Sequence, residues 1–317
     1  MSDSVRIAMI GAGAVADYHH VPGIRIDPRA RLVAVCDPVP EALERVGREF
    51  GVTRRYADAG EFLDTVAERA RAAGLVASYH PHLGSLAQAP EQIDAIVVTH
   101  DHGDHTRGMG VFARRHGTPL YMTQRTRAAC EKLLRGAETI VEYRPGRAFL
   151  IGDVRVEPFL TVHDAADPVG VTLVDECTGL RLGVATDLGR PTAQVRHALS
   201  SCDLLILEAN HDEVLLHTSA YPASVRRRIA SSHGHLSNQA AARFVVDLLH
   251  PRLAGVVLAH LSKECNRPVL ARSVVGEALE KAGWSGHLEV APQDRPTALL
   301  DVEELRYRAG PSQLSFL

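Results

Sequence analysis

The chain has 317 residues, of which 45% are hydrophobic and 23% charged, as in an ordinary globular protein with one large or two modest domains. Its net charge of -3 excludes a protein that attracts polyanions by bulk charge, and no apolar stretch has the length of a membrane span. No signal peptide precedes Val5, and the five cysteines are widely spaced without a C-x-x-C pair. We therefore expect a cytoplasmic protein with reduced thiols and no membrane partner.

The first predicted strand, residues 5–10, runs directly into a glycine-rich turn that contains Gly11 and Gly13. The second predicted strand, residues 32–36, ends at Asp37 and is followed by a helix over about 41–50. This G-x-G-x-x-A pattern fits dinucleotide recognition, because glycines let a pyrophosphate approach a helix N-terminus while an acid binds the ribose. Gly11, Gly13 and Asp37 are therefore candidate NAD-binding residues.

From Val5 to about Leu63 the chain resembles the N-terminal Rossmann half of the Gfo/Idh/MocA oxidoreductases. The strings that carry this resemblance, besides the glycines, are Tyr18-His19-His20-Val21-Pro22 and Glu49-Phe50-Gly51-Val52. The resemblance then stops, because the family's catalytic Glu-Lys-Pro motif is matched only by Glu131-Lys132-Leu133, which lacks the proline and lies in a predicted helix over 126–134. A lone βαβ unit rarely makes a complete dinucleotide cleft, so bound NAD is not favoured. A helix over 61–73 is predicted to close this segment.

The richest set of candidate metal ligands follows the apolar run of residues 93–98, which predicts a short buried strand. The loop after it reads Thr99-His100-Asp101-His102-Gly103-Asp104-His105. His100 and His102 can face one ion, and Asp104 and His105 can face a second. Imidazole nitrogen together with carboxylate oxygen suits zinc, manganese or iron.

Three later predicted strands also end in a possible ligand. His163 follows residues 154–162, Asp187 follows residues 180–185, and His260 follows residues 256–259. Ligands at the carboxyl ends of strands are typical of α/β folds. Residues 169–174 and 204–207 are also predicted strands, and helices are predicted from the N-cap Ser237 to 249 and over 269–282.

The H-x-H-x-D-H string is the signature of the metallo-β-lactamase superfamily, which the chain resembles from Ile93 onward. The resemblance implies an α/β fold, the αββα four-layer sandwich, and two metal ions, zinc or manganese. His100, His102 and His163 would hold one ion; Asp104, His105 and His260 would hold the other; Asp187 would bridge them. Residues 75–317 would form this hydrolase domain, and residues 1–74 the Rossmann-like segment.

An alternative for the N-terminus stays open. Metallo-β-lactamase folds also begin with a strand and a glycine-rich turn, so residues 5–13 and 32–37 could instead be strands integrated into the sandwich.

Over residues 93–300 the chain resembles more closely the YycJ/WalJ group, cytosolic metal-dependent hydrolases associated with phosphodiester cleavage in nucleic acids. The strings that carry this resemblance are His163-Asp164-Ala165-Ala166-Asp167-Pro168-Val169-Gly170, Ala185-Thr186-Asp187-Leu188-Gly189, Gly234-His235-Leu236-Ser237-Asn238 and Leu258-Ala259-His260-Leu261-Ser262-Lys263-Glu264. Two departures are the group's usual N-terminus, which is absent or unrecognisable here, and Cys265, where the group commonly has Asn.

The function that this resemblance implies is a phosphodiesterase, most specifically a DNA exonuclease, that uses a metal-bridging hydroxide. Asp104, Asp187 and His235 are the candidate catalytic residues. His235 would contact phosphate or protonate the leaving group, with a structural role at the helix entry as the alternative, and His211 is a weaker candidate of the same kind. Arg226, Arg227 and Arg228 could hold a nucleic-acid backbone, although a solvated helix face is the favoured interpretation.

Two other functions use the same residues differently. The metal ligands would also serve a thioester or lactam hydrolase, since only the residues that line the substrate site would differ. A non-catalytic NAD-binding or redox module would rest on Gly11, Gly13 and Asp37 alone.

Overall fold

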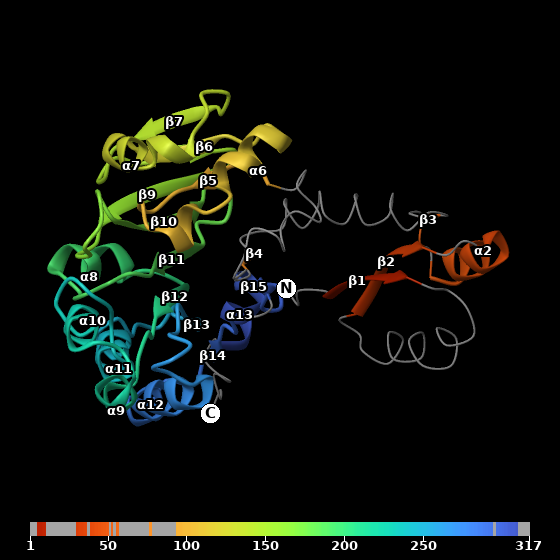
Figure 1. Cartoon of the computed structure of the whole chain (residues 1–317). Helices are drawn as coiled ribbons and strands as arrows, with labels where there is room; N and C mark the ends of the chain where they lie inside the picture. Colours follow the sequence, from red (N-terminus) through yellow and green to blue (C-terminus); the bar gives the residue numbers. More distant parts are fainter. Residues whose placement is uncertain are drawn as a thin grey trace. The chain divides into compact units, whose positions relative to one another are not determined.

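A computed structural model describes residues 5–10, 30–36, 39–50, 52, 55–56, 76–77, 93–293 and 296–309 (Figure 1). The chain divides into two compact units, Met1–Ala73 and Gly74–Leu317. Within the described ranges, no helix combines the length and the apolar character needed to cross a membrane.

The described residues of the first unit form a parallel sheet in the order β1-β2-β3 and the helix α2. Its elements are β1 (Val5–Ile10), β2 (Ala30–Cys36), α2 (Pro40–Glu49) and β3 (Arg55–Tyr56). Pro40 suits the first turn of α2, where no backbone donor is required, and Leu43 and Val46 are the buried face of the helix. Both predicted strands and the predicted helix over 41–50 are confirmed; the predicted helix over 61–73 lies outside the described residues.

The strand pairing bears on the two interpretations of the N-terminus. Among the described residues, β1 pairs parallel with β2, and β2 pairs parallel with β3. This parallel pairing agrees with a Rossmann-like segment, and the integration of these strands into the sandwich stays an untested alternative.

The second unit is built on a seven-stranded sheet in the order β14-β13-β12-β11-β10-β9-β8. Its strands are β8 (Phe149–Ile151), β9 (Val154–Leu160), β10 (Val169–Asp175), β11 (Arg181–Ala185), β12 (Leu204–Glu208), β13 (Gly255–Ala259) and β14 (His287–Val290). The strands from β8 to β11 are antiparallel, and those from β11 to β14 are parallel. β12 and β13 are buried along their whole length, as expected for apolar central strands covered on both faces.

Helices cover one face of this sheet, and the C-terminal elements cover the other (Figure 1). The helices of the first face are α8 (Ala193–Leu199), α11 (Asn238–Asp247) and α12 (Pro268–Lys281). The opposite face packs against α13 (Val302–Ala309) and β15 (Leu300–Asp301), and β15 pairs antiparallel with β4 (Val76–Ala77). The predicted strands and the two predicted helices of this region are confirmed, whereas β14, β15 and α13 were not predicted.

A second, parallel sheet in the order β5-β6-β7 carries the first metal-ligand loop. Its elements are β5 (Ile96–Val97), α5 (Gly103–Thr106), α6 (Met109–His116), β6 (Leu120–Thr123), α7 (Gln124–Ala129), a 3-10 turn (Glu131–Leu133) and β7 (Ile140–Tyr143). Val98, Met109, Leu120 and Met122 form its core. β5 is shorter than predicted, and the helix predicted over 126–134 is wrong in its second half, because α7 ends at Cys130 and tightens into the 3-10 turn.

Candidate metal centre

The carboxyl ends of several strands deliver polar side chains to one site. The loop after β5 carries His100 to His105, the chain after β9 carries His163, and Asp187 and His260 follow β11 and β13. β11, β12 and β13 are parallel neighbours, so their carboxyl ends meet at the same edge of the sheet.

Asp187 and His260 both adopt left-handed backbone conformations, with φ of 53° and 56°. A non-glycine residue in this region costs roughly 1–3 kcal/mol and persists where surrounding structure holds it in place. Both residues turn the chain sharply at a strand end and thereby aim their side chains into the site.

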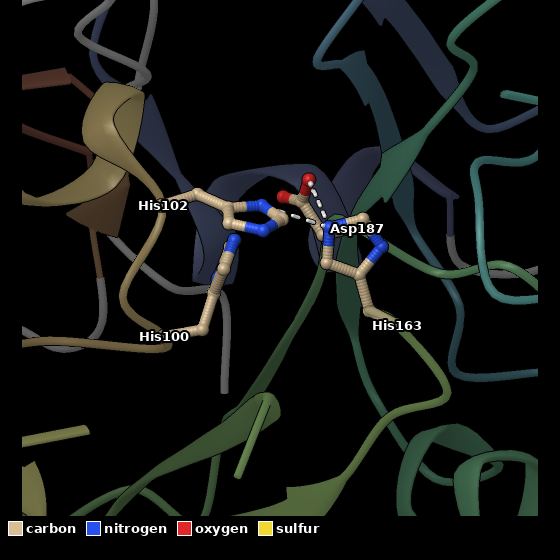
Figure 2. A group of neighbouring side chains, drawn as sticks. All are labelled: His100, His102, His163 and Asp187. Carbon is tan, nitrogen blue, oxygen red and sulfur yellow. Dashed lines mark hydrogen bonds and ion pairs between the residues drawn. The ribbon is translucent and has the colours of Figure 1, made fainter. Parts of the chain in front are cut away.

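The first ligand group consists of His100, His102, His163 and Asp187; each offers one possible ligand atom, and these four atoms lie within 4.8 Å of one another. Figure 2 shows these four side chains pointing toward a common centre. His163 Nε2 lies 3.1 Å from His102 Nδ1 and 3.5 Å from Asp187 Oδ1. His163 Nδ1 donates to the carbonyl oxygen of Gly234 at 3.0 Å, so its Nε2 is the nitrogen free to bind an ion.

The second ligand group consists of Asp104, His105 and His260. Asp104 Oδ2 lies 3.6 Å from His105 Nε2 and 3.4 Å from His260 Nε2. Asp187 Oδ2 faces the same group, 3.0 Å from His105 Nε2 and 3.7 Å from His260 Nε2. The two carboxylate oxygens of Asp187 therefore face different groups.

The donor atoms present fit divalent metal ions. His100 Nε2, His105 Nε2 and Asp187 Oδ2 are buried and have no assigned hydrogen bond among the described residues, although the last two atoms lie 3.0 Å apart. Buried polar atoms normally have a hydrogen-bond partner, and a buried donor or acceptor without one costs free energy of folding. Three such atoms in a cluster of imidazoles and carboxylates are what a metal site provides before its ion is added.

Burial also sets the protonation that metal binding requires. Burial and the neighbouring His105 lower the pKa of His100 to about 3, and burial lowers the pKa of His163, so both imidazoles are neutral near pH 7. The pKa of Asp104 lies well below its ordinary value because of the hydrogen bond with His260, so this carboxylate is ionised.

A carboxylate that sequence analysis did not single out, Glu208, organises one side of the site. It is fully buried at the end of β12. Its Oε1 accepts hydrogen bonds from His235 Nδ1 at 2.7 Å and His260 Nδ1 at 2.9 Å. Its Oε2 accepts from the backbone N–H groups of Leu188 and Leu236, each at 3.0 Å. Burial alone would raise the pKa of Glu208, but the bonds with His235 and His260 lower it, so the carboxylate stays ionised.

Two glycines allow the loop of His235 to pack against its neighbours. A Cβ at Gly189 would lie 2.3 Å from the carbonyl oxygen of Ser232, and one at Gly234 would lie 2.2 Å from the carbonyl oxygens of Arg228 and Ile229. Because these two glycines have no side chain, the loop packs closely enough for His235 to reach Glu208. His235 Nδ1 then lies 3.7 Å from Asp187 Oδ1.

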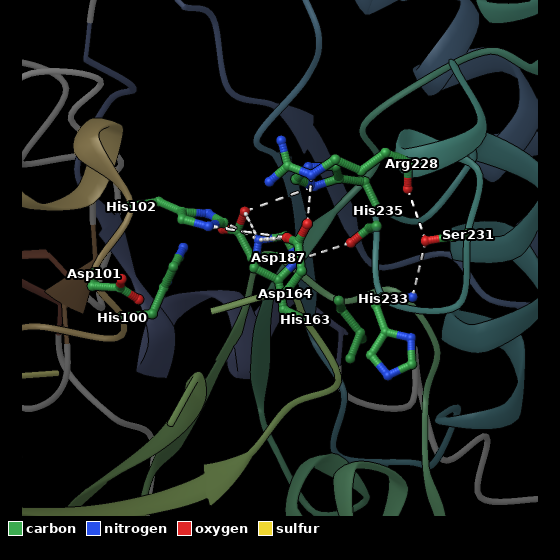
Figure 3. A network of polar contacts seen from close by, with 12 residues as sticks. His100, Asp101, His102, His163, Asp164, Asp187, Arg228, Ser231, His233 and His235 are labelled. Carbon is green, nitrogen blue, oxygen red and sulfur yellow. Dashed lines mark hydrogen bonds and ion pairs between the residues drawn. The ribbon is translucent and has the colours of Figure 1, made fainter. Parts of the chain in front are cut away.

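An ion pair between Arg228 and Asp164 borders the first ligand group (Figure 3). Asp164 Oδ1 lies 3.5 Å from His163 Nε2 and 4.0 Å from His102 Nε2. Arg228 comes from α10 (Ala223–Ile229) and lines the cavity of about 470 Å³ above the metal ligands.

Comparison with known proteins agrees with this fold. Residues 62–260, more than half of the chain, match the family described as the beta-lactamase superfamily domain. The chain belongs to the metallo-β-lactamase superfamily. It is a metal-dependent hydrolase of this superfamily and falls in the YycJ/WalJ group.

Two curated relatives are similar over most of their length. The exodeoxyribonuclease YycJ of Bacillus anthracis is 34% identical over 194 residues, which are 61% of this chain and 73% of the relative. The exodeoxyribonuclease WalJ of Streptococcus pneumoniae serotype 2 is 33% identical over 204 residues, 63% of this chain and 75% of the relative.

Two solved structures share the superfamily fold at low sequence identity. The metallo-β-lactamase fold protein YhfI from Bacillus subtilis has a TM-score of 0.51 at 18% identity and covers 69% of this chain and 82% of its own. Zn²⁺-bound PqqB from Methylobacterium extorquens has a TM-score of 0.51 at 16% identity and covers 70% of this chain and 80% of its own.

The N-terminus matches a different family. Residues 5–115 match the oxidoreductase family with an NAD-binding Rossmann fold, which overlaps the superfamily match over residues 62–115.

The structure places the predicted site residues unevenly. The predicted metal ligands come together with His235 at one edge of the two sheets of the superfamily fold; the set is His100, His102, Asp104, His105, His163, Asp187 and His260. Gly11, Gly13 and Asp37 lie outside the described residues. Glu208 was missed, although its position after the apolar strand of residues 204–207 was the same signal that identified Asp187.

Proposed function

We propose that the chain is a dinuclear-metal phosphodiesterase that degrades DNA from an end. His100, His102 and His163 would hold one ion, and Asp104, His105 and His260 the other. The observation that carries the proposal is the orientation of Asp187, because Oδ1 faces His163 and Oδ2 faces His105 and His260. A carboxylate divided in this way between two ligand groups suits a bridge between two ions.

Two bound divalent ions, zinc or manganese, would supply a hydroxide nucleophile at neutral pH and neutralise charge on the phosphoryl oxygens. The protein's own residues then have three tasks. Asp104 and Asp187 remain ionised and position the ions. Glu208 fixes His235 through Nδ1, which leaves Nε2 as the nitrogen that can exchange a proton with the leaving oxygen.

DNA as the substrate is supported by the names of the two curated relatives, both exodeoxyribonucleases at about one-third identity. The same metal ligands would also serve hydrolysis of a thioester or a lactam. The choice of substrate therefore depends on the residues that line the site around the ions. Arg228, beside the ligands at the mouth of the metal cavity, adds a cation where a phosphate would enter.

A substrate comparison tests the proposal. The purified protein is incubated with manganese or zinc and with end-labelled linear single-stranded and double-stranded DNA, a thioester and a cephalosporin. We expect mononucleotide release from DNA and none without metal. Turnover of the thioester or the cephalosporin in the absence of DNA cleavage would contradict it.

A second candidate concerns the first unit alone. Its parallel β1-β2-β3 sheet and the match of residues 5–115 to the NAD-binding Rossmann family favour a dinucleotide-binding module. A fluorescence titration with NADH tests this: saturable binding supports it, and an unchanged signal up to millimolar NADH rejects it.

A further inference from the structure

A second cavity, of about 620 Å³, lies beside the cavity that contains the metal ligands. Helix α10 contributes to both, because Arg227 lines the second cavity and Arg228 lines the metal cavity. His235 lines both as well. Figure 3 shows His235 and Arg228 close to Asp187 and Asp164.

The wall of the second cavity has the mixed character of a small-molecule site. Leu216, on α9 (Glu213–Thr218), and Leu236 are buried apolar side chains, and Ala223 and Ala240 add small apolar surface. Ligand sites typically enclose 300–1,000 Å³, mostly apolar, with a few polar groups that fix orientation. The volume suits one nucleotide unit and does not suit a duplex.

Two polar groups of this wall have no partner in the part of the chain that the structure describes. His211 is only 3% exposed, and its Nδ1 makes no hydrogen bond. Burial lowers the pKa of His211, so the ring that lines the cavity is neutral.

Arg227 is the second polar group, and its two arginine neighbours on α10 differ from it because both have partners. Arg226 donates to the carbonyl oxygens of Ser219 and Tyr221, and Arg228 pairs with Asp164. Arg227 is exposed and makes no ion pair or hydrogen bond with any described residue, so its guanidinium can contact a phosphate or stack on a base. Glu213, also on the wall, already accepts a hydrogen bond from Ser237.

We propose that the second cavity binds the terminal nucleoside of a DNA strand whose adjoining phosphodiester lies in the metal cavity. This inference rests on the proposed phosphodiesterase function and specifies how the end of the strand is recognised. The base lies against Leu216 and Leu236 with His211 at its edge, and Arg227 contacts the strand at the cavity rim. Because the cavity has room for one nucleotide unit, the strand ends there, which gives removal of terminal nucleotides a structural basis.

Two substrates separate the reaction from the recognition of the nucleoside. An end-labelled linear oligonucleotide requires both cavities, whereas methyl p-nitrophenyl phosphate is a phosphodiester with no nucleoside on either side of phosphorus. The ratio of kcat/KM for the two substrates therefore measures use of the second cavity.

The test compares two cavity variants with two matched controls. Ala223→Phe fills the cavity, and Ser224→Phe adds the same side chain to the next exposed residue of α10, which does not line it. Arg227→Ala removes the unpaired guanidinium, and Arg243→Ala removes an exposed charge on α11 outside both cavities. Circular dichroism and metal content verify the fold of each variant.

We expect each cavity variant to lower the ratio of oligonucleotide to small-diester kcat/KM by roughly 10- to 100-fold, the size of one lost base-binding contact. The controls should keep the parental ratio. A parental protein that cleaves both substrates, with cavity variants that match their controls, overturns the second-cavity inference alone. A parental protein that cleaves neither phosphodiester rejects the proposed function itself.

Discussion

β1 in the first unit and β5 in the second belong to parallel sheets, and each is followed in the sequence by a candidate ligand-binding motif, yet the described residues show different surroundings for the two motifs. In the second unit, Asp104 lies 3.4 Å from His260, which is 156 residues later in the chain. In the first unit, the described strands pair only with one another, and the motif residues lie outside the described residues. A catalytic site is specified by convergence of distant strand ends, which a short local motif cannot provide.

If this contrast is correct, substitution of the residue at which the strand ends converge should lower metal binding and turnover the most. Asp187→Ala removes the carboxylate whose two oxygens face the two ligand groups, so we expect loss of bound metal and a fall in phosphodiester turnover of roughly 10³-fold or more. Metal analysis and a nuclease assay on the purified variant measure this. Asp247→Ala, which removes an exposed partner of Arg196, is the control and should change neither.

The next effect concerns His235, which touches the site without belonging to either proposed set of metal ligands. His235→Ala should retain metal and lower kcat on the order of 10²- to 10⁴-fold if the imidazole donates a proton to the leaving group. His233→Ala, an exposed histidine two residues away in the same loop, should behave as the parent. Equal activity of the two variants would remove His235 from the mechanism.

A smaller effect is expected from Glu208, which acts through the histidines that it holds. Glu208→Gln keeps the shape but removes the charge that orients His235 and His260, so we expect roughly 10- to 100-fold losses in metal affinity or in turnover. Equilibrium dialysis with manganese and steady-state kinetics measure the two losses separately. An unchanged metal affinity together with an unchanged kcat would show that the buried carboxylate serves packing alone.

The smallest effect should come from the first unit. Gly11→Ala combined with Asp37→Ala removes the nucleotide fingerprint, and we expect metal content and phosphodiester turnover to stay within a few-fold of the parent. Gel filtration and circular dichroism verify that the double variant is folded. A selective loss of turnover in a folded, metal-loaded double variant would show that the first unit contributes to catalysis and would contradict the contrast between the two units.

Much of the second unit could be predicted from sequence because its signals are local. Short apolar runs mark β12 and β13, the Ser237 cap marks the start of α11, and a histidine or aspartate close after a strand marks a candidate ligand.

The parts that could not be predicted depend on packing between distant segments. β14 is only half buried along its length, so it lacks a strong apolar run, and β15 forms only through its pairing with β4. Glu208 resembles any acid at a strand end until the structure shows its four donors. Cys130 ends α7 although the helical pattern of the sequence continues beyond it.

A metal titration of the protein freed of metal by a chelator tests the central claim most directly. Activity on a phosphodiester is measured while manganese or zinc is added in known equivalents, and bound metal is counted at each step. We expect no activity in the metal-free protein and a plateau at two bound ions per chain. Full activity without metal, or a plateau at a single bound ion, would contradict the two-ion site centred on Asp187.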